Sequence, residues 1–225
     1  MAENQWTTVD RYLTDHVVPS DAALDAALHA IEQAGLPAIS VSPNLGKLLY
    51  LYARMISARN VLEIGTLGAY STIWLARAVG SNGRVITLEA DPKHAQVARA
   101  NIARAGLSSI IDLRLGRASE TLTALAAEGA GPFDLTFIDA DKVSTVDYFN
   151  WALEHSHAGS LIIVDNVVRD GAVANPGSTD ASVKGMQRFF ERLAGESRVE
   201  ATALQTVGSK GYDGFALARV LADRR

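Results

Sequence analysis

The sequence predicts an α/β fold built on a mostly parallel sheet, with helices on both faces and an antiparallel hairpin at the C-terminal end. From residue 60 onward, short apolar runs rich in β-branched residues alternate with amphipathic stretches, which is typical of βαβ units. Beyond residue 195 this alternation stops, and two strand-like runs follow one another across the short segment 208–214. Strands joined by so short a connection must run antiparallel.

Each element of this fold has its own local signal. The expected strands occupy 61–64, 84–89, 111–115, 135–139, 160–165, 198–207 and 215–220. Helices are expected over 71–79, 92–105, 118–127, 145–155 and 183–194. Gly106 directly follows the second of these helices, as a helix stop should.

Residues 1–58 are expected to form helices that cap the α/β core at 60–225, the whole of 1–225 being a single domain. Ser42 and Pro43 provide a cap and a first helical residue. Behind them runs an apolar stripe with helical spacing: Leu45, Leu48, Leu49, Tyr52, Met55 and Ile56. Because an apolar helical flank needs covering, we expect a homodimer.

Composition excludes several classes of function. The net charge is −4, and no basic stretch is present that could neutralise the phosphates of a nucleic acid. The chain has no cysteine, which excludes disulfides, thiolate metal sites and a thiol nucleophile. No apolar run approaches the roughly 20 residues of a membrane span, and the first residues lack the pattern of a signal peptide. We therefore expect a cytoplasmic protein that binds neither nucleic acid nor membrane.

A glycine loop between the first strand and its helix predicts a nucleoside-type ligand. Gly65 and Gly68 allow close approach of a ligand to the backbone, and the helix start behind them favours negative charge. Their spacing is Gly-x-x-Gly rather than the Gly-x-Gly-x-x-Gly of dinucleotide binders, which counts against a nicotinamide cofactor. Glu89 ends the next strand, where an acidic side chain typically bonds ribose hydroxyls.

Two further strands end in aspartate. Asp139 closes the run Leu135-Thr136-Phe137-Ile138, and Asp165 closes Leu161-Ile162-Ile163-Val164, with Asn166 directly after it. Ligands of parallel sheets lie outside the carboxyl ends of the strands, where these side chains would meet. Two carboxylates and an amide oxygen form the hard oxygen set that holds a divalent cation. Mg²⁺ is the favoured ion, with Ca²⁺ or Mn²⁺ as alternatives.

Three motifs together resemble the cation-dependent class I O-methyltransferases, the group that includes caffeoyl-CoA and catechol O-methyltransferases and bacterial relatives. The motifs are Leu62-Glu63-Ile64-Gly65, Phe137-Ile138-Asp139-Ala140-Asp141-Lys142 and Val164-Asp165-Asn166, in the family's order and spacing. The resemblance runs from about Ser40 to the C-terminus. It implies a Rossmann-like fold with a seven-stranded sheet, a reversed last strand, and S-adenosylmethionine as methyl donor.

The resemblance also assigns residues. Donor-binding positions would be Val41, Glu63, Gly65, Thr66, Ser71, Glu89, Ala118, Asp139 and Asp141. The metal ligands would be Asp139, Asp165 and Asn166. Lys142 matches the lysine that acts as general base in the family, and a nearby cation would help it to give up its proton. The implied substrate is a small aromatic molecule with vicinal hydroxyl groups, which would fill the open coordination positions of the metal.

The chain departs from the plant enzymes of this family after Asn166. A tryptophan that those enzymes carry near position 169 is replaced by Arg169, and a substrate-contacting asparagine by Asp170. Arg169 is expected either to meet an acidic or carbonyl group of the substrate or to lie solvated in a loop. The turn-rich segment 172–181 is expected to be mobile and able to cover the site.

Two other functions stay open on the sequence alone. A nicotinamide-dependent oxidoreductase would keep the fold, although the loop spacing argues against it. A protein that binds S-adenosylmethionine without turnover would keep the donor residues, although the complete set of acids, amide and lysine argues for catalysis.

Overall fold

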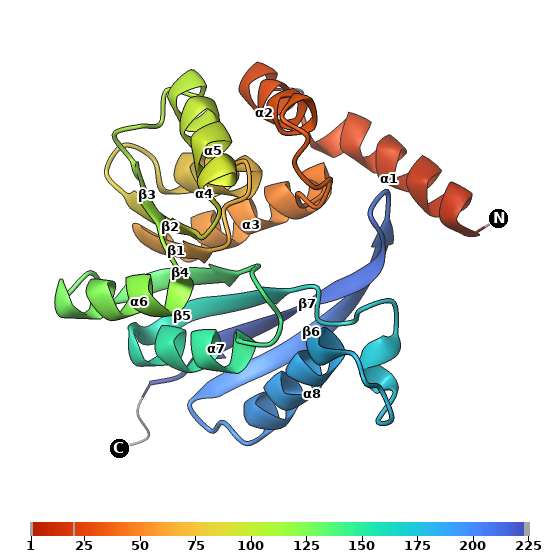
Figure 1. The fold of residues 1–225 in the computed structure, drawn as a ribbon, viewed down its shortest axis with the longest axis vertical. Coiled ribbons are helices and arrows are strands. Elements are labelled where there is room, and N and C mark those ends of the chain that lie inside the picture. Colours follow the sequence, from red (N-terminus) through yellow and green to blue (C-terminus); the bar gives the residue numbers. More distant parts are fainter. Residues whose placement is uncertain (1, 20, 223–225) are drawn as a thin grey trace.

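The computed structural model, described over residues 2–19 and 21–222, contains a seven-stranded sheet with helices on both faces (Figure 1). The strands are β1 (Asn60–Ile64), β2 (Arg84–Glu89), β3 (Ile111–Leu115), β4 (Phe133–Ile138), β5 (Ser156–Asp165), β6 (Val199–Gly208) and β7 (Gly211–Val220). Their order in the sheet is β3-β2-β1-β4-β5-β7-β6, and β7 is antiparallel to both of its neighbours. The predicted fold class is confirmed.

The helices divide between the two faces of the sheet. Three helices precede the first strand: α1 (Ala2–Val17), α2 (Ala22–Gln33) and α3 (Pro43–Met55). The later ones are α4 (Tyr70–Val79), α5 (Pro92–Arg104), α6 (Ala118–Ala127), α7 (Thr145–Glu154), the short 3₁₀ helix η1 (Ala172–Ala174) and α8 (Ala181–Ala194). Figure 1 shows α3, α4 and α5 over one face and α6, α7 and α8 over the other. Within the described ranges, no helix has the length and apolarity that crossing a membrane requires.

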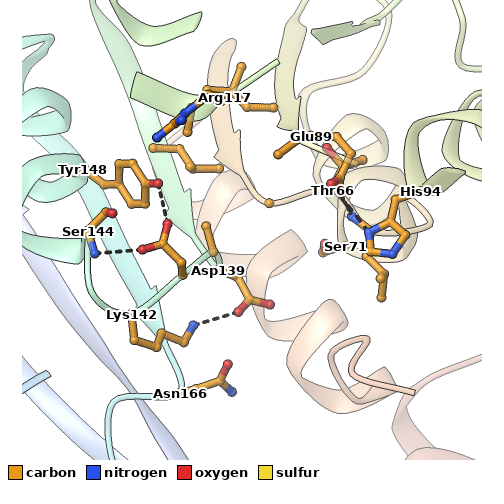
Figure 2. Close-up of a pocket in the computed structure, with 18 of the residues that line it drawn as sticks. Thr66, Ser71, Glu89, His94, Arg117, Asp139, Lys142, Ser144, Tyr148 and Asn166 are labelled. Carbon is orange, nitrogen blue, oxygen red and sulfur yellow. Dashed lines mark hydrogen bonds and ion pairs between the residues drawn. The ribbon is translucent and has the colours of Figure 1, made fainter. Parts of the chain in front are cut away.

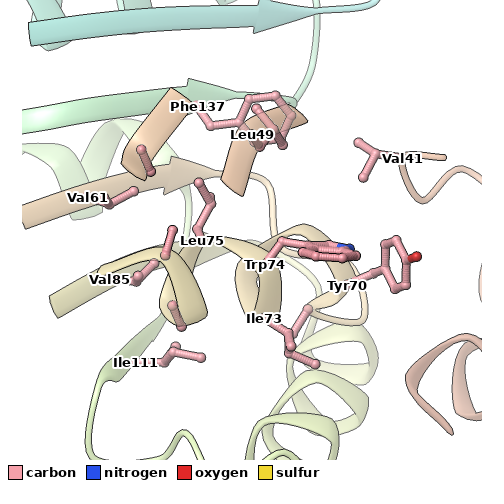
Figure 3. Packing of buried hydrophobic residues seen from close by; sticks show 14 of the residues in the cluster. Val41, Leu49, Val61, Tyr70, Ile73, Trp74, Leu75, Val85, Ile111 and Phe137 are labelled. Carbon is pink, nitrogen blue, oxygen red and sulfur yellow. The ribbon is translucent and has the colours of Figure 1, made fainter. Parts of the chain in front are cut away.

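Each face of the sheet has its own apolar core, because successive side chains of a strand point to opposite faces. In β1, Val61 packs with α3 and α4, for example against Leu49 and Leu75 (Figure 3). The next residue, Leu62, packs in the other core with Phe149 of α7. Both faces of the central strands are therefore buried, which explains their continuous apolar sequences.

Side-chain caps fix the starts of several helices. Ser42 Oγ accepts a hydrogen bond from the Leu45 backbone N–H at 3.2 Å, as the sequence predicted for the start of α3. Asp21 caps α2 through the backbone N–H groups of Ala23 and Leu24. The same carboxylate pairs with Arg77 of α4, with a shortest distance of 2.5 Å, and so ties the N-terminal helices to the core.

The C-terminal hairpin is tighter than the sequence predicted. The segment 208–214 was expected to be the connection, but Gly208 pairs with Gly211 and the loop between the strands is Ser209-Lys210. Gly214 lies inside β7, where an added Cβ would come within 2.2 Å of the Leu204 carbonyl oxygen. This glycine therefore allows close packing within the sheet rather than a turn. Strand β5 also begins four residues earlier than expected, at Ser156 instead of Ser160.

The sheet places its switch point between β1 and β4. Strand β1 pairs with β2 on one side and with β4 on the other, so the chain winds outward in both directions from this pair. Gly65 follows β1 with φ of +102°, and a Cβ there would lie 2.0 Å from the Asp139 carbonyl oxygen. Only glycine fits where the two loops approach so closely. This edge of the sheet carries the candidate site.

Candidate active site

A cavity of about 1070 Å³ opens at the carboxyl ends of the parallel strands. Most of the residues expected to bind donor, metal or substrate line it: Val41, Gly65, Thr66, Ser71, Glu89, Ala118, Asp139, Asp141, Lys142, Asn166 and Arg169. Figure 2 shows that Glu89, Thr66 and His94 lie at one side of the cavity, and Asp139, Lys142 and Asn166 at another. The sequence therefore located the cavity and about half of its polar lining.

Glu89 is held rigidly at the end of β2. Its Oε2 accepts a hydrogen bond from the Leu67 backbone N–H at 2.7 Å, and its Oε1 accepts one from the Asp91 backbone N–H at 2.9 Å. His94, which the sequence analysis did not single out, lines the same region with Nδ1 3.5 Å from Glu89 Oε1. A fixed carboxylate beside an open cavity is suited to accept hydrogen bonds from vicinal hydroxyls such as those of a ribose.

Glu63 was expected to contact the methyl donor directly, but its side chain does not line the cavity. Its side chain is 0% exposed and lies beneath α4. It accepts hydrogen bonds from Ser71 Oγ at 2.6 Å, Thr72 Oγ1 at 2.5 Å and Thr87 Oγ1 at 2.6 Å. Burial raises the pKa of Glu63 to about 7, although the three hydroxyl groups act in the opposite direction. Glu63 thus supports Ser71, which does line the cavity.

Thr66 also contributes less through its side chain than expected. Its Oγ1 lies 2.6 Å from Thr87 Oγ1, and Thr87 in turn donates to Glu63. The hydroxyl groups therefore form a chain that ends on the buried carboxylate. Because the Thr66 carbonyl also accepts a hydrogen bond from the Ala69 N–H at 2.9 Å, the backbone N–H of Thr66 is the group left for a ligand.

The start of α6 supplies a different kind of contact. Ala118 is the first residue of this helix and lines the cavity, as do Gly116 and Arg117 directly before it. Backbone N–H groups in the first turn of a helix have no partner within the helix. They can therefore donate to acceptor atoms of a ligand at the place where the sequence expected a backbone contact.

The predicted metal ligands follow the ends of the neighbouring strands β4 and β5; Asp139 and Asn166 line the cavity, whereas Asp165 lies outside its lining. Asp165 is 5% exposed and accepts a hydrogen bond from the Asn166 backbone N–H at 2.8 Å. Burial and the negative charge of Asp139 raise the pKa of Asp165. Asn166 lines the cavity and has a left-handed backbone, with φ of +55°, that turns the chain directly after the strand.

The side-chain oxygens of Asp139, Asp165 and Asn166 are of the kind that binds a divalent cation. A bound cation would offset the repulsion between the charges of Asp139 and the buried Asp165, and carboxylate and amide oxygens are ligands of Mg²⁺ and Ca²⁺. Lys142 is 8% exposed, and its Nζ lies 3.0 Å from Asp139 Oδ1. One oxygen of Asp139 is therefore paired with the lysine, and the other is available to a metal.

Asp141 is oriented by two partners that the sequence did not predict. Tyr148 of α7 donates its hydroxyl hydrogen bond to Asp141 Oδ2 at 2.6 Å, and the Ser144 backbone N–H donates to Oδ1 at 2.9 Å (Figure 2). Burial and this hydrogen bond raise the pKa of Tyr148 to about 12. Both oxygens of Asp141 thus have fixed directions in the cavity wall.

The two residues expected to contact substrate separate. Arg169 lines the cavity, whereas Asp170 is exposed and lies outside the lining. The reason is a turn in which Arg169, Asp170 and Gly171 all have positive φ values, closed by a hydrogen bond of 2.9 Å from the Ala172 N–H to the Arg169 carbonyl. The segment 172–181 also contributes no lining residue, and Gln187 donates hydrogen bonds to the carbonyls of Val173 and Asn175 in it.

A parallel sheet with a reversed last strand and a ligand cavity at its switch point defines a Rossmann-like methyltransferase fold. The family model described as O-methyltransferase matches residues 16–221. The chain belongs to this O-methyltransferase family.

Relatives and solved structures agree over nearly the whole chain. A catechol O-methyltransferase of Niastella koreensis is 54% identical over 213 residues, covering 95% of this chain and 96% of the relative. The structure of an O-methyltransferase from Bacillus cereus in complex with SAH is 53% identical, covers 96% of this chain and 99% of its own, and has a TM-score of 0.95. The O-methyltransferase TomG of Streptomyces achromogenes, solved in complex with SAM, is 46% identical, covers 99% and 100% of the two chains, and also has a TM-score of 0.95.

These similarities establish the general activity. The protein is an S-adenosylmethionine-dependent O-methyltransferase that acts on a small molecule. Membership of this family argues against the nicotinamide-dependent alternative.

Proposed function

We propose that the protein methylates one hydroxyl of a vicinal dihydroxy aromatic molecule with the help of a divalent cation. The observation that carries the proposal is the position of three oxygen-bearing side chains at the ends of β4 and β5: Asp139 and Asn166 line the cavity, and Asp165 is buried directly before Asn166. The similarity to the catechol O-methyltransferase of Niastella koreensis supports the same substrate class.

Lys142 would act as the general base. Its ammonium group is held 3.0 Å from Asp139 Oδ1, next to the oxygens that would bind the cation. In its neutral form it would take the proton of the attacking hydroxyl. The hydroxyl oxygen then forms a bond to the methyl carbon of S-adenosylmethionine, while the bond between that carbon and sulfur breaks and its electron pair stays on the sulfur. The products are the methyl ether and S-adenosylhomocysteine.

A phenol has a pKa near ~10, so only a small fraction is ionised at neutral pH. A divalent cation bound by the acidic pair and Asn166 would supply Lewis acidity, favouring the ionised hydroxyl and orienting a chelating pair of oxygens. S-adenosylmethionine would be bound by Glu89, which would accept hydrogen bonds from its ribose, and by Ser71, which Glu63 holds in place.

The test is methylation of catechol by the purified protein, with mass spectrometry of the product. We expect EDTA to abolish turnover and excess Mg²⁺ to restore it. Asp165→Asn should lower kcat/KM at least about 100-fold, because even loss of a residue that only orients a metal ligand costs about 10- to 100-fold. The matched control is Asp112→Asn on β3, outside the cavity, which should leave kcat/KM unchanged.

Two outcomes would contradict the proposal in different ways. Turnover that is equal with and without EDTA would remove the metal from the mechanism. Tight binding of S-adenosylhomocysteine without methylation of any catechol would favour a donor-binding protein without turnover.

We also propose that the protein is a homodimer formed through α1 and β6. Helix α1 contacts β6, which is the edge strand of the sheet, and both carry exposed apolar side chains. On α1 these are Val9, Tyr12, Leu13 and Val17, and on β6 they are Leu204 and Val207. An edge strand beside an apolar helical surface needs a partner.

Sedimentation equilibrium tests the homodimer. It should give twice the chain mass for the native protein and the single chain mass for Tyr12→Glu. A monomeric native protein would refute the proposal.

A further inference from the structure

The side chain of Arg169 lies in the wall of the cavity with a buried nitrogen that has no hydrogen-bond partner among the described residues. Arg169 lines the cavity together with Lys142 and Asn166, at the side where the acidic pair lies. Its Nε is buried and makes no hydrogen bond to any described residue. Leaving a charged, buried donor unpaired costs free energy, which an acceptor on a ligand would recover.

The backbone fixes the position of this side chain. Asp213 Oδ1 accepts hydrogen bonds from the N–H groups of Val168 at 2.9 Å, Arg169 at 3.0 Å and Gly214 at 2.9 Å. The turn that carries Arg169 is thereby anchored to β7, and its φ of +56° is a conformation that side chains other than glycine rarely adopt. Such strain persists where the surrounding structure enforces it, often at a ligand site.

The neighbouring acids already have other partners. The charge of Arg169 helps to lower the pKa of Asp180, but the two residues form no ion pair among the described residues. Asp180 Oδ1 instead caps α8 by accepting hydrogen bonds from the Ser182 and Val183 N–H groups. Asp213 is occupied by the backbone N–H groups named above. Neither acid forms a hydrogen bond or ion pair with the Arg169 side chain among the described residues, so the guanidinium remains open to a ligand.

The geometry points to Arg169 as a specificity residue for catechols that carry a carboxylate, a proposal that rests on the proposed function. We infer that the guanidinium receives the carboxylate of the substrate while its two hydroxyl groups lie near Asp139, Asp165 and Asn166. A planar guanidinium binds a planar carboxylate through two parallel hydrogen bonds. Unsubstituted catechol has no acceptor at this place, and a neutral carbonyl group gives a weaker hydrogen bond than a carboxylate. The Lys142 ammonium is already paired with Asp139, so Arg169 is the cation on this side of the cavity that has no carboxylate partner among the described residues.

The test compares a matched pair of substrates, 3,4-dihydroxybenzoate and its methyl ester, which differ in the carboxylate charge. We expect the native protein to favour the acid over the ester by about tenfold or more in kcat/KM. Arg169→Met should lower kcat/KM for the acid about 10- to 100-fold and change that for the ester less than about threefold, as expected for loss of a charge-assisted hydrogen bond. Arg169→Lys keeps the charge but loses the two parallel N–H donors of the guanidinium, so its preference for the acid should lie between those of the native protein and Arg169→Met.

Lys184→Met is the matched control, because it removes one positive charge from the exposed side of α8 outside the cavity. Its ratio of acid to ester should equal that of the native protein. Equal losses for acid and ester in Arg169→Met, or no preference in the native protein, would overturn the inference.

Binding separates this inference from the proposed function. Calorimetry with the protein saturated by S-adenosylhomocysteine and Mg²⁺ should show tighter binding of the acid than of the ester, and Arg169→Met should abolish the difference. If nothing is methylated but this difference is present, the proposed function fails and the role of Arg169 stands. If both substrates are methylated without any difference, the proposed function stands and the role of Arg169 fails.

Discussion

Glu63 makes the stability of the ligand-free protein depend on pH. The side chain is fully buried, and burial raises its pKa to about 7 from 4.5. Between these values the folded state binds a proton that the unfolded state has released, so the free energy of unfolding falls as pH rises. The stabilisation is complete below about pH 4.5 and is lost as pH passes through about 7.

The size of this effect follows from the pKa difference. A shift of about 2.5 units corresponds to roughly 3 kcal/mol, of which about 2–3 kcal/mol falls between pH 5 and 8. Glu63→Gln copies the protonated carboxyl. Its carbonyl oxygen can accept from Thr72 and Thr87, while its NH₂ group can donate to Ser71, whose hydroxyl then turns toward the cavity.

The assay is urea unfolding followed by tryptophan fluorescence at pH 5, 6, 7 and 8 for both proteins. The variant should gain about 2–3 kcal/mol relative to the native protein as pH rises from 5 to 8. Asp165 also has a raised pKa, but it is present in both proteins and cancels in the difference. A difference that stays constant over this range, or that changes with the opposite sign, would refute the reasoning.

Three further substitutions test other parts of the site. Lys142→Met should lower kcat about 10²- to 10⁴-fold, as loss of a general base does, while calorimetry shows unchanged binding of S-adenosylhomocysteine; weakened binding with normal kcat would contradict its role. Tyr148→Phe removes the donor to Asp141 Oδ2 and should weaken binding of the methyl donor about tenfold, and an unchanged Kd would show that the orientation of Asp141 is irrelevant. Gly65→Ala places a Cβ 2.0 Å from the Asp139 carbonyl oxygen, on a residue with positive φ. Thermal unfolding should therefore show that the free energy of unfolding falls by about 3–5 kcal/mol. A fall below about 1 kcal/mol would mean that the two loops can separate freely.

The sequence predicted most of the fold because its central strands are buried on both faces. Continuous apolar runs mark β1, β2, β4 and β5 clearly, and their carboxyl ends locate the cavity. The error at the hairpin arose because glycine favours both turns and close backbone contact, and Gly214 serves the second purpose.

The site was predicted less completely, for two physical reasons. Glu63 lies in a strand that is buried on both faces, so its polarity alone did not show whether its side chain faces α4 or the cavity. Its spacing of two residues from Val61, which packs under α4, would have indicated that Glu63 faces α4. Tyr148 and His94 lie on helices whose first turns border the cavity, and no motif marks them. The buried state of Arg169 Nε depends on three-dimensional packing that the sequence does not encode locally.

The most direct test of the central claim is a crystal structure of the protein with S-adenosylhomocysteine, catechol and Mn²⁺, in which anomalous scattering locates the metal. We predict one ion at about 2.0–2.3 Å from an oxygen of each of Asp139, Asp165 and Asn166, with both catechol oxygens completing its coordination. An ion bound elsewhere, or catechol bound in the cavity with no ion beside these three residues, would contradict the account.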